Sequence, residues 1–358
     1  MIRLFSPYMN KDIAGAVTNT LFSGCLTQGP KVEEFEKEFS KLFNVKYAVS
    51  FNSGTSALET AYDLIGLKEG DEVITTPMTC LATNIPLLAR KVKIVWVDID
   101  EKTLTISRHD VLSKITDKTK AIVQVHLGGI MAGLKDCYSE YARIPIVSDA
   151  CQALGIFTGD YTACSFQSIK HITTGDGGML ILNNEEDYKK AKLMRWFGID
   201  RERKIDEGWE SYKTRMMSFD VEILGYKRHM NDIAATMGLV GLKEYHNILE
   251  HRKKIFEIYK ERLSKIDGVK LVDGEVNMYW LATVLVESRD DFARKLFEAG
   301  IEVNLVQVRN DRYAIFENKK VELPIMDKIE NKYISIPIGP HISAEEANYV
   351  CDCIKRGW

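Results

Sequence analysis

Residues 47–67, YAVSFNSGTSALETAYDLIGL, combine a short apolar run, a cluster of small residues and a longer mixed segment. The apolar run at 47–51 predicts a buried strand, and the segment after the small residues predicts a helix. A strand that enters a helix through such a short turn is typical of α/β proteins. We therefore expect an α/β fold.

The same order recurs through the first half of the chain. Further apolar strands are predicted in DEVITTP (71–77), KIVWVDID (93–100), KAIVQVHLGG (120–129) and IPIVSDACQALG (144–155). Strands that alternate with helices predict a mostly parallel central sheet covered by helices on both faces. Because parallel strands end at one edge of a sheet, their polar tips should gather there, where ligands bind. These tips are residues 52–55, the loop from Thr76, His126 and Asp149.

Length and composition suit an ordinary globular protein. The chain has 358 residues, of which 45% are apolar and 28% are charged. Beyond residue 240 the pattern changes to a long charged helix at 245–266, followed by further strand and helix patterns. We therefore expect a large domain at 1–240 and a smaller C-terminal α/β domain at 241–358.

Charge and cysteine content argue against several classes of function. The net charge of −3 gives no basic excess, so neither nucleic acid nor an acidic membrane is an expected partner. No segment approaches the roughly 18 apolar residues that span a bilayer. The seven scattered cysteines, with Cys351 and Cys353 as an isolated pair, predict neither a disulfide framework nor a metal site. Together with the lack of a signal pattern, they indicate a reducing, cytoplasmic location.

Two of the strand tips carry groups that could bind a ligand. Ser53, Gly54 and Thr55 open a helix, so they form either a phosphate cradle or an ordinary N-cap. Asp149 either caps the following helix or pairs with a protonated ring nitrogen. Each stretch leaves both alternatives open when it is taken alone.

The segment SFQSIKHITTGDGGML (165–180) places Lys170 beside His171. Its apolar surroundings would desolvate Lys170 and leave a nucleophilic amine, as Schiff-base chemistry requires. His171 has no partner at metal-ligand spacing, and a hydrolase that uses it lacks a GxSxG motif. No GxGxxG or Walker A motif follows the first strand. A phosphate cradle, an acid for a pyridine nitrogen and a lysine for an aldehyde together match pyridoxal 5′-phosphate (PLP) chemistry.

In order and spacing, the motifs NSGTSAL, GDEVITTPMT, SDACQALG, KHITTGDGG and GYKRHMNDIAATMGL resemble those of the DegT/DnrJ/EryC1/StrS family of sugar aminotransferases. KHITTGDGGM is most similar to the perosamine-synthase-like members. The resemblance covers nearly the whole chain and implies a fold-type I PLP-dependent transferase. It also implies a homodimer with shared active sites.

The resemblance also implies roles for individual residues around the cofactor ring. Lys170 is similar to the lysine that bonds to the cofactor and later moves protons. Asp149 resembles the acid that pairs with the pyridine nitrogen, Ala150 would pack on one ring face, and Gln152 would lie near the ring hydroxyl. Cys80 stands where the family usually has an aromatic residue that stacks on the other face, and a thiol cannot stack in that way.

The cofactor phosphate should contact a second group of residues. Gly54, Thr55 and Ser165 match family contacts to the phosphate, with Ser53 at the start of the same cradle. Lys227 matches a position, often Asn, that reaches the partner subunit's cofactor phosphate. A lysine would suit a phosphate as a point charge.

The expected reaction transfers an amino group from glutamate to a nucleotide-linked keto-deoxysugar, with an NDP-4-keto-6-deoxyhexose as the leading substrate class. Candidate substrate contacts are Thr27, His126 and Arg309, with Trp196 and Arg201 as weaker ones. His126 is either near the site or structural, and Arg309 either grips phosphates or forms a salt bridge. The alternatives are a sugar dehydratase of the same fold, in which histidine replaces the lysine, and a non-catalytic PLP-binding regulator. We expect adjacent side chains of a strand-like segment around Lys170 to point to opposite sides, so Lys170 and His171 should not both face the cofactor.

Overall fold

The computed structural model describes residues 1–134, 144–200, 221–317 and 320–358. Within these ranges the centre of the molecule is a seven-stranded sheet in the order β1-β7-β6-β5-β4-β2-β3. Its strands are β1 (Tyr47–Phe51), β2 (Glu72–Thr75), β3 (Lys93–Trp96), β4 (Thr119–Val125), β5 (Ile146–Asp149), β6 (Tyr161–Ser165) and β7 (Gly178–Leu182). Neighbouring strands are parallel except where β7 pairs with β1 and β6. The predicted α/β fold with a mostly parallel sheet is confirmed.

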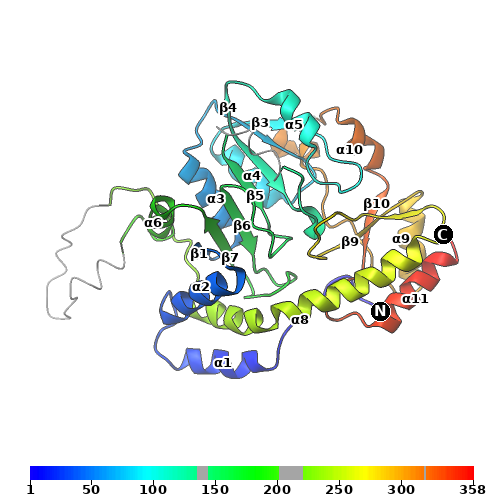
Figure 1. Ribbon diagram of the computed structural model, residues 1–358, viewed down its shortest axis with the longest axis horizontal. Coiled ribbons are helices and arrows are strands. Elements are labelled where there is room, and N and C mark those ends of the chain that lie inside the picture. Colours follow the sequence, from blue (N-terminus) through cyan, green and yellow to red (C-terminus); the bar gives the residue numbers. More distant parts are fainter. Residues whose placement is uncertain (135–143, 201–220, 318–319) are drawn as a thin grey trace.

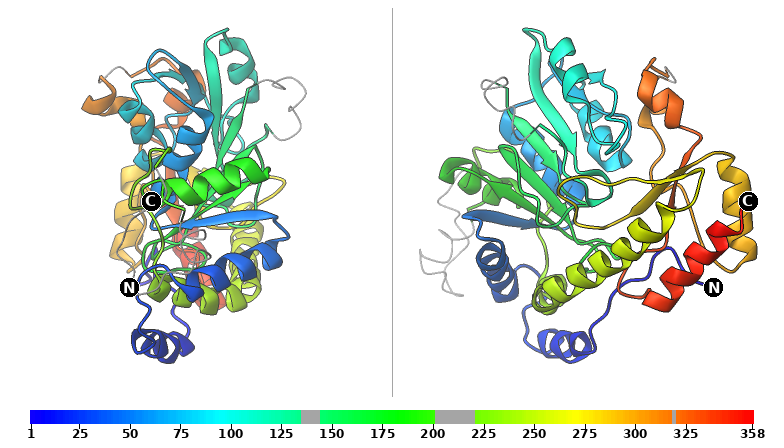
Figure 2. Two further views of the ribbon diagram at one scale, coloured as in Figure 1. Left: turned by 90° about the vertical axis from the view of Figure 1, so that its left-hand side faces the viewer. Right: turned by 45° about the vertical axis from the view of Figure 1, so that its right-hand side comes forward.

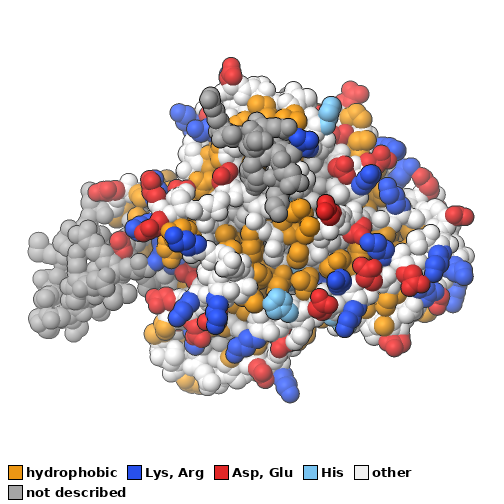
Figure 3. Space-filling model, in the orientation of Figure 1, with side chains coloured by type: hydrophobic (Ala, Val, Ile, Leu, Met, Phe, Trp, Pro, Cys, Tyr) orange, Lys and Arg blue, Asp and Glu red, His pale blue; other side chains and the backbone are white. Residues whose placement is uncertain are grey.

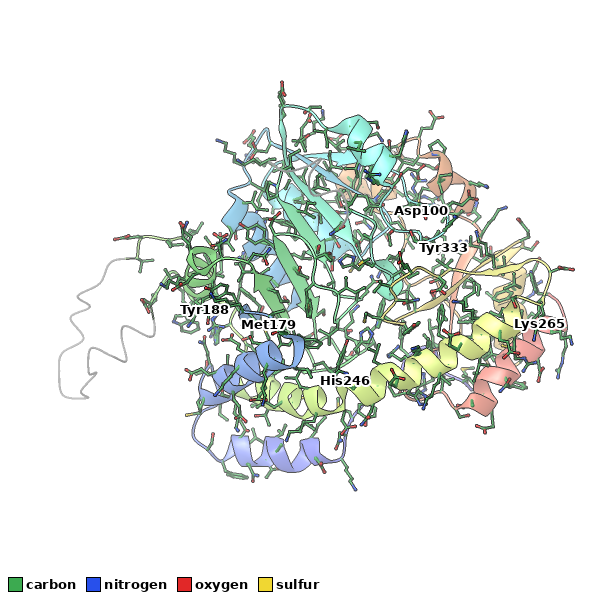
Figure 4. All side chains as sticks on the ribbon, in the orientation of Figure 1. Asp100, Met179, Tyr188, His246, Lys265 and Tyr333 are labelled. Carbon is green, nitrogen blue, oxygen red and sulfur yellow. The ribbon has the colours of Figure 1, made fainter. Side chains whose placement is uncertain are left out.

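Helices cover both faces of this sheet (Figures 1 and 2). Side chains alternate along β7, so Met179 packs on one face and Leu180 on the other. The Met179 face is covered by α2 (Pro30–Phe43) and α8 (Asp232–Leu263), and Figure 4 shows Met179 close to α2. The Leu180 face is covered by α3 (Gly54–Ile65) and α6 (Glu185–Met194). Among the described residues, this region also contains α1 (Asp12–Leu21), α4 (Leu81–Ala89), α5 (Arg108–Lys114) and the 3₁₀ turn η1 (Leu127–Gly129).

A second, antiparallel sheet lies in the C-terminal part of the chain, in the order β10-β9-β8. Its strands are β8 (Val269–Leu271), β9 (Ala282–Val286) and β10 (Tyr333–Ile336). They pack with α9 (Arg289–Glu298) and α11 (Ala344–Lys355) in a core of their own. Shorter elements are α10 (Pro324–Ile329), η3 (Asn310–Arg312) and η4 (Ala314–Phe316).

Helix α8 joins the two cores. Tyr245 and Ile248 pack against the large sheet, whereas Phe256 and Tyr259 pack into the C-terminal core. Positions 240 and 241 therefore lie inside one continuous helix. At the other end of the chain, Ile2 pairs with Ile301, so the first residues lie beside the C-terminal part. The division into 1–240 and 241–358 stays a prediction.

The surface charge and the character of the helices both match what the sequence predicts. On the face shown in Figure 3, basic and acidic side chains are intermixed rather than gathered by sign. In the described ranges, the structure contains no helix with the length and apolar character that crossing a membrane requires.

Candidate active site

Lys170 lies in the connection between β6 and β7, on a turn rather than a strand. Its backbone N–H donates to the carbonyl oxygen of Gln167 at 2.9 Å, and the ladder of paired strands resumes only at Gly178. The strand-like alternation expected here was therefore wrong. Burial lowers the pKa of Lys170, although Cys151 and Asp149 nearby act in the opposite direction. Lys170 is thus desolvated as the sequence predicts, but its backbone forms a turn instead of the expected strand-like segment.

Trp280 is a residue of this site that the sequence did not single out. The Nζ atom of Lys170 lies 3.7 Å from the centroid of the Trp280 ring. The indole Nε1 donates to the carbonyl oxygen of Ile169 at 3.0 Å, and Phe5 stacks on Trp280 with 5.7 Å between ring centroids. Trp280 thus forms a rigid wall against the end of Lys170. In a single sequence nothing separates this tryptophan, two residues before the apolar strand β9, from an ordinary core residue.

His171 has a structural role beside the lysine. Its Nε2 lies 2.6 Å from the carbonyl oxygen of Met278, so that nitrogen carries the proton and donates. The ring is buried, and burial lowers the pKa of His171 to about 3. A neutral imidazole that is already used to hold Met278 is a poor candidate for the reactive group.

Asp149 ends β5 with both carboxylate oxygens held. Its Oδ1 accepts from the backbone N–H of Cys151 at 3.0 Å, and its Oδ2 accepts from the Thr83 hydroxyl at 2.6 Å. The next residue, Ala150, is buried. The Oε1 atom of Gln152 accepts from the Gly128 N–H at 2.7 Å, which fixes the direction of its amide. Asp149 therefore presents an oriented carboxylate next to the sheet edge.

The start of α3 forms a close-fitting cradle. Ser53 is its N-cap, and the Ser53 hydroxyl accepts from the Ser56 N–H at 3.1 Å. A Cβ on Gly54 would lie 2.8 Å from Cys151 Sγ and 3.0 Å from Ser165 Cβ, so only glycine brings the helix this close to both. As the first residues of a helix, Gly54 and Thr55 have N–H groups with no acceptor within that helix. These groups and the helix dipole suit a phosphate.

These groups fit PLP in chemistry and in placement. The lysine supplies an amine whose pKa burial lowers, Asp149 supplies an oriented carboxylate, and α3 supplies donors for a phosphate. They come from the ends of β6, β5 and β1, which the sheet brings to one edge. Cys80, the exposed N-cap residue of α4, acts electrostatically on Lys170 and so lies at the same edge.

Arg309 requires a correction. Its guanidinium is fully buried and donates to Asp311, Asp327 and Glu330 and to the carbonyl oxygen of Val321. All its donor nitrogens are thus used within the chain, and the expected contact with substrate phosphates is contradicted. Arginine with three carboxylates forms an internal ionic cluster, which the bare motif VRNDRY could not distinguish from a phosphate site.

His126 lies beside Asp149 but is engaged within the chain. Its backbone N–H donates to the carbonyl oxygen of Asp149, its Nδ1 accepts from the Ala132 N–H at 3.0 Å, and its Nε2 lies 3.1 Å from the Thr158 hydroxyl. The ring is completely buried, and burial lowers its pKa to about 3. These partners contradict a direct substrate contact and favour the structural alternative.

The other expected contacts gather next to the cradle. The Thr27 hydroxyl lies 3.0 Å from His229 Nε2, and the Trp196 ring meets His229 edge-on at 4.3 Å. Exposed Lys227 lies on the same segment, which pairs with the end of β1 through Phe51 and His229. Arg201 lies outside the described residues.

The two buried imidazoles predict acid sensitivity. A histidine whose folded pKa is about 3 and whose ordinary value is 6.5 takes up a proton on unfolding between those values, so stability falls as the pH falls. At pH 5 each histidine should remove on the order of 2 kcal/mol of unfolding free energy relative to pH 7. We expect His171→Gln to be less stable at pH 7 but to lose less on acidification. Urea unfolding at both pH values measures this.

His246 provides the control, because it lies exposed on α8 (Figure 4). His246→Gln should show the same loss between pH 7 and pH 5 as the unchanged protein. An equal loss in His171→Gln would contradict the burial argument.

Comparison with known proteins identifies the family of this chain. The model of the DegT/DnrJ/EryC1/StrS aminotransferase family matches residues 7–355. The chain belongs to this family. Among its relatives, the GDP-perosamine synthase of Escherichia coli O157:H7 is 28% identical over 92% of this chain and 91% of its own length. The UDP-4-amino-4,6-dideoxy-N-acetyl-beta-L-altrosamine transaminase of Campylobacter jejuni is 30% identical over 95% and 93%.

Solved structures of other proteins share the fold. The sugar aminotransferase CalS13 from Micromonospora echinospora superposes with a TM-score of 0.90 at 31% identity, over all of both chains. Spr1654 from Streptococcus pneumoniae was solved in a pyridoxamine phosphate (PMP) form, with a TM-score of 0.88 at 27% identity over 99% and 98% of the chains. Its PLP form has a TM-score of 0.87 at 26% identity over 99% and 97%. The aminotransferase activity and the PLP cofactor predicted from the sequence are confirmed.

Proposed function

We propose that this aminotransferase moves an amino group from glutamate to a nucleotide-linked keto-deoxysugar, with an NDP-4-keto-6-deoxyhexose as the leading class. The observation that carries the proposal is the desolvated Lys170 at one sheet edge with the held carboxylate of Asp149 and the start of α3. The two relatives named for nucleotide sugars support the substrate class. Their names carry different nucleobases, GDP and UDP, so the test compares several bases.

The chain's own residues divide the work. When bound, PLP supplies an aldehyde that combines with amines and a ring that takes up electrons. Lys170 provides the amine that would exchange with substrate amines at the cofactor, and it would carry the proton between the donor carbon and the cofactor. Asp149 keeps a positive charge in place at the ring nitrogen. The N–H groups of Gly54 and Thr55, with the hydroxyls of Thr55 and Ser165, hold the phosphate.

Intact Lys170 favours an aminotransferase over a dehydratase of the same fold. In the dehydratase branch a histidine occupies the lysine position, whereas here the neighbouring histidine is bonded to Met278. A regulator that binds PLP without turnover is the remaining alternative. It differs in one measurable respect, since it would bind cofactor but give no reaction with glutamate.

The test follows the two half-reactions separately. Purified protein loaded with PLP is mixed with glutamate, and conversion to the PMP form is followed by absorbance together with 2-oxoglutarate release. The PMP form is then offered keto-sugars linked to UDP, GDP and dTDP, with the keto group at C3 or C4. We expect glutamate to convert the cofactor and a 4-keto-sugar nucleotide to restore it. Cofactor binding without the glutamate reaction would indicate the regulator instead.

We further propose a homodimer in which Lys227 reaches the partner subunit's cofactor phosphate. Lys227 is exposed, and nearby apolar side chains are exposed as well, with Leu224 at 75% and Tyr226 at 49%. Such side chains gain from being covered by a second copy. A charged side chain next to the cradle of its own chain could instead serve that same site.

Complementation separates the two arrangements. Lys227→Ala should weaken PLP binding about tenfold through loss of a charge-assisted contact. At a PLP concentration that leaves Lys227→Ala mostly without cofactor, mixing it with Lys170→Ala, which is expected to be inactive, should restore activity when subunits exchange. In a hybrid dimer one site then has both lysines intact. Lys270→Ala, an exposed lysine on β8, is the control. If Lys227 served its own chain, mixing would produce no gain over Lys227→Ala alone.

A further inference from the structure

A chain of buried hydroxyl groups lies behind Asp149. The Thr83 hydroxyl donates to Asp149 Oδ2 at 2.6 Å, and the Thr79 hydroxyl lies 2.8 Å from that of Thr83. Thr79 is 1% exposed and Thr83 is completely buried, so bulk water does not compete for these bonds. Thr79 precedes α4 and Thr83 lies in its first turn; the Thr83 hydroxyl bonds to Oδ2, whereas the Cys151 N–H bonds to Oδ1.

The direction of the hydrogen bonds follows from Asp149. A carboxylate only accepts hydrogen bonds, so the Thr83 hydroxyl must donate its single proton to Asp149 Oδ2. The Thr83 oxygen can then only accept from its neighbour, so Thr79 donates to Thr83. Both protons point toward the carboxylate, and hydrogen bonds aligned in this way polarise and strengthen one another. The arrangement stabilises a negative charge on Asp149 and fixes the position of Oδ2.

Asn310, from the C-terminal part of the chain, anchors the two threonines. Its Nδ2 donates to the carbonyl oxygen of Thr79 at 2.8 Å, and its Oδ1 accepts from Asn84 Nδ2 at 2.9 Å. Its backbone N–H donates to the carbonyl oxygen of Pro77 at 2.8 Å. Asn310 thus holds both the loop before α4 and the residue that follows Thr83. The adjoining Arg309 cluster fixes Asn310 in turn.

We propose that Thr83 and Thr79 are positioning residues for Asp149 and that Asn310 anchors them, so the C-terminal part of the chain helps to set the group that faces the cofactor ring nitrogen. This rests on the proposed function only for the role of Asp149. The hydroxyl chain itself is independent of any ligand.

Cofactor binding gives the first test. Thr83→Val keeps the shape and removes the hydroxyl, so we expect the dissociation constant for PLP to rise tenfold or more, with a changed absorption spectrum of the bound cofactor. Thr83→Ser restores the hydroxyl and should stay within about threefold of the unchanged protein. Thr236→Val is the matched control, because the Thr20 and Thr236 hydroxyls form a buried pair with the same 2.8 Å separation elsewhere. Equal affinity and spectrum in Thr83→Val and the unchanged protein would overturn the proposal.

Double substitution tests whether the threonines act in series. Thr79→Val alone should weaken PLP binding severalfold, but it should add nothing once Thr83→Val is present, because its effect passes through the missing hydroxyl. Asn310→Asp, which loses the donor to Thr79, should behave in the same way. Additive losses would mean that each residue acts separately, and the proposal that the hydroxyl groups act in series would be refuted.

The protein without cofactor separates this proposal from the proposed function. Urea unfolding of Thr83→Val, Asp149→Asn and the double variant forms a cycle that needs no PLP. We expect the shift of the midpoint in the double variant to differ clearly from the sum of the single shifts. If the unchanged protein failed to react with glutamate while this coupling was present, the proposed function would be refuted, but the positioning of Asp149 by the hydroxyl chain would be supported. Additive shifts would refute the positioning role of the hydroxyl chain, whether or not the protein reacts with glutamate.

Discussion

Lys170→Ala is expected to abolish amino transfer and to bind PLP without the visible absorbance of the lysine-bound form. Loss of a general base alone costs about 10²- to 10⁴-fold in rate. The substitution also removes the amine that bonds to the cofactor, so the total loss should be at the upper end of this range or beyond. Single-turnover absorbance with glutamate measures the rate, and the spectrum of the PLP-loaded variant measures the bond.

Two controls make the result specific to the amine of Lys170. Lys170→Arg keeps a long basic side chain but cannot form the covalent bond, so it should be as inactive as Lys170→Ala. Lys270→Ala should retain normal rates. Turnover in Lys170→Ala close to that of the unchanged protein would refute the mechanism and reopen the question of His171.

Asp149→Asn should produce the second-largest loss, on the order of 10³-fold in the reaction with glutamate. Asparagine keeps the shape: its amide oxygen can accept from the Cys151 N–H and its amide nitrogen can donate to the Thr83 oxygen, so the site should remain assembled. It lacks the negative charge that stabilises a proton on the ring nitrogen, and the ring then takes up electrons poorly. Stopped-flow absorbance during the glutamate reaction measures the rate.

Asp160→Asn is the matched control at the other end of β5. Its carboxylate accepts from the Ile146 N–H at 2.8 Å, so it also binds the backbone of this strand, but away from the ligand edge. We expect normal rates from it. A similar loss in both variants would show that the strand, rather than the charge of Asp149, had been disturbed.

The sheet could be predicted largely because its strands are buried on both faces. Strands β1, β4 and β5 are buried over most of their length and each leads into a polar tip, so these strands and their common edge could be expected from the sequence. Strands β6 and β7 escaped detection, because β6 contains Thr162 and Ser165 and β7 begins in a glycine cluster. Their antiparallel pairing places Lys170 on a turn between them.

The candidate site could be predicted where the chemistry of a residue and its near neighbours indicated its role. It could not be predicted where the role depended on contacts with residues elsewhere in the chain. Asp149 and the cradle follow from strand ends, and desolvation of Lys170 follows from its apolar neighbours. Arg309 was misassigned because two of its carboxylate partners, Asp327 and Glu330, lie outside the motif, 18 and 21 positions further on, and meet it only through folding. Trp280 and Asn310 were missed for the same reason, since each contacts residues more than 100 positions away.

Helix α8 bears on how the chain can be divided. Its first half completes the core over the large sheet, and its second half completes the core of the C-terminal sheet. A fragment that ended at residue 240 would leave apolar side chains of the first core without their cover, and the complementary fragment would begin in mid-helix without an N-cap. Neither half should be obtainable as a stable separate protein, and heat should melt both sheets in a single cooperative transition.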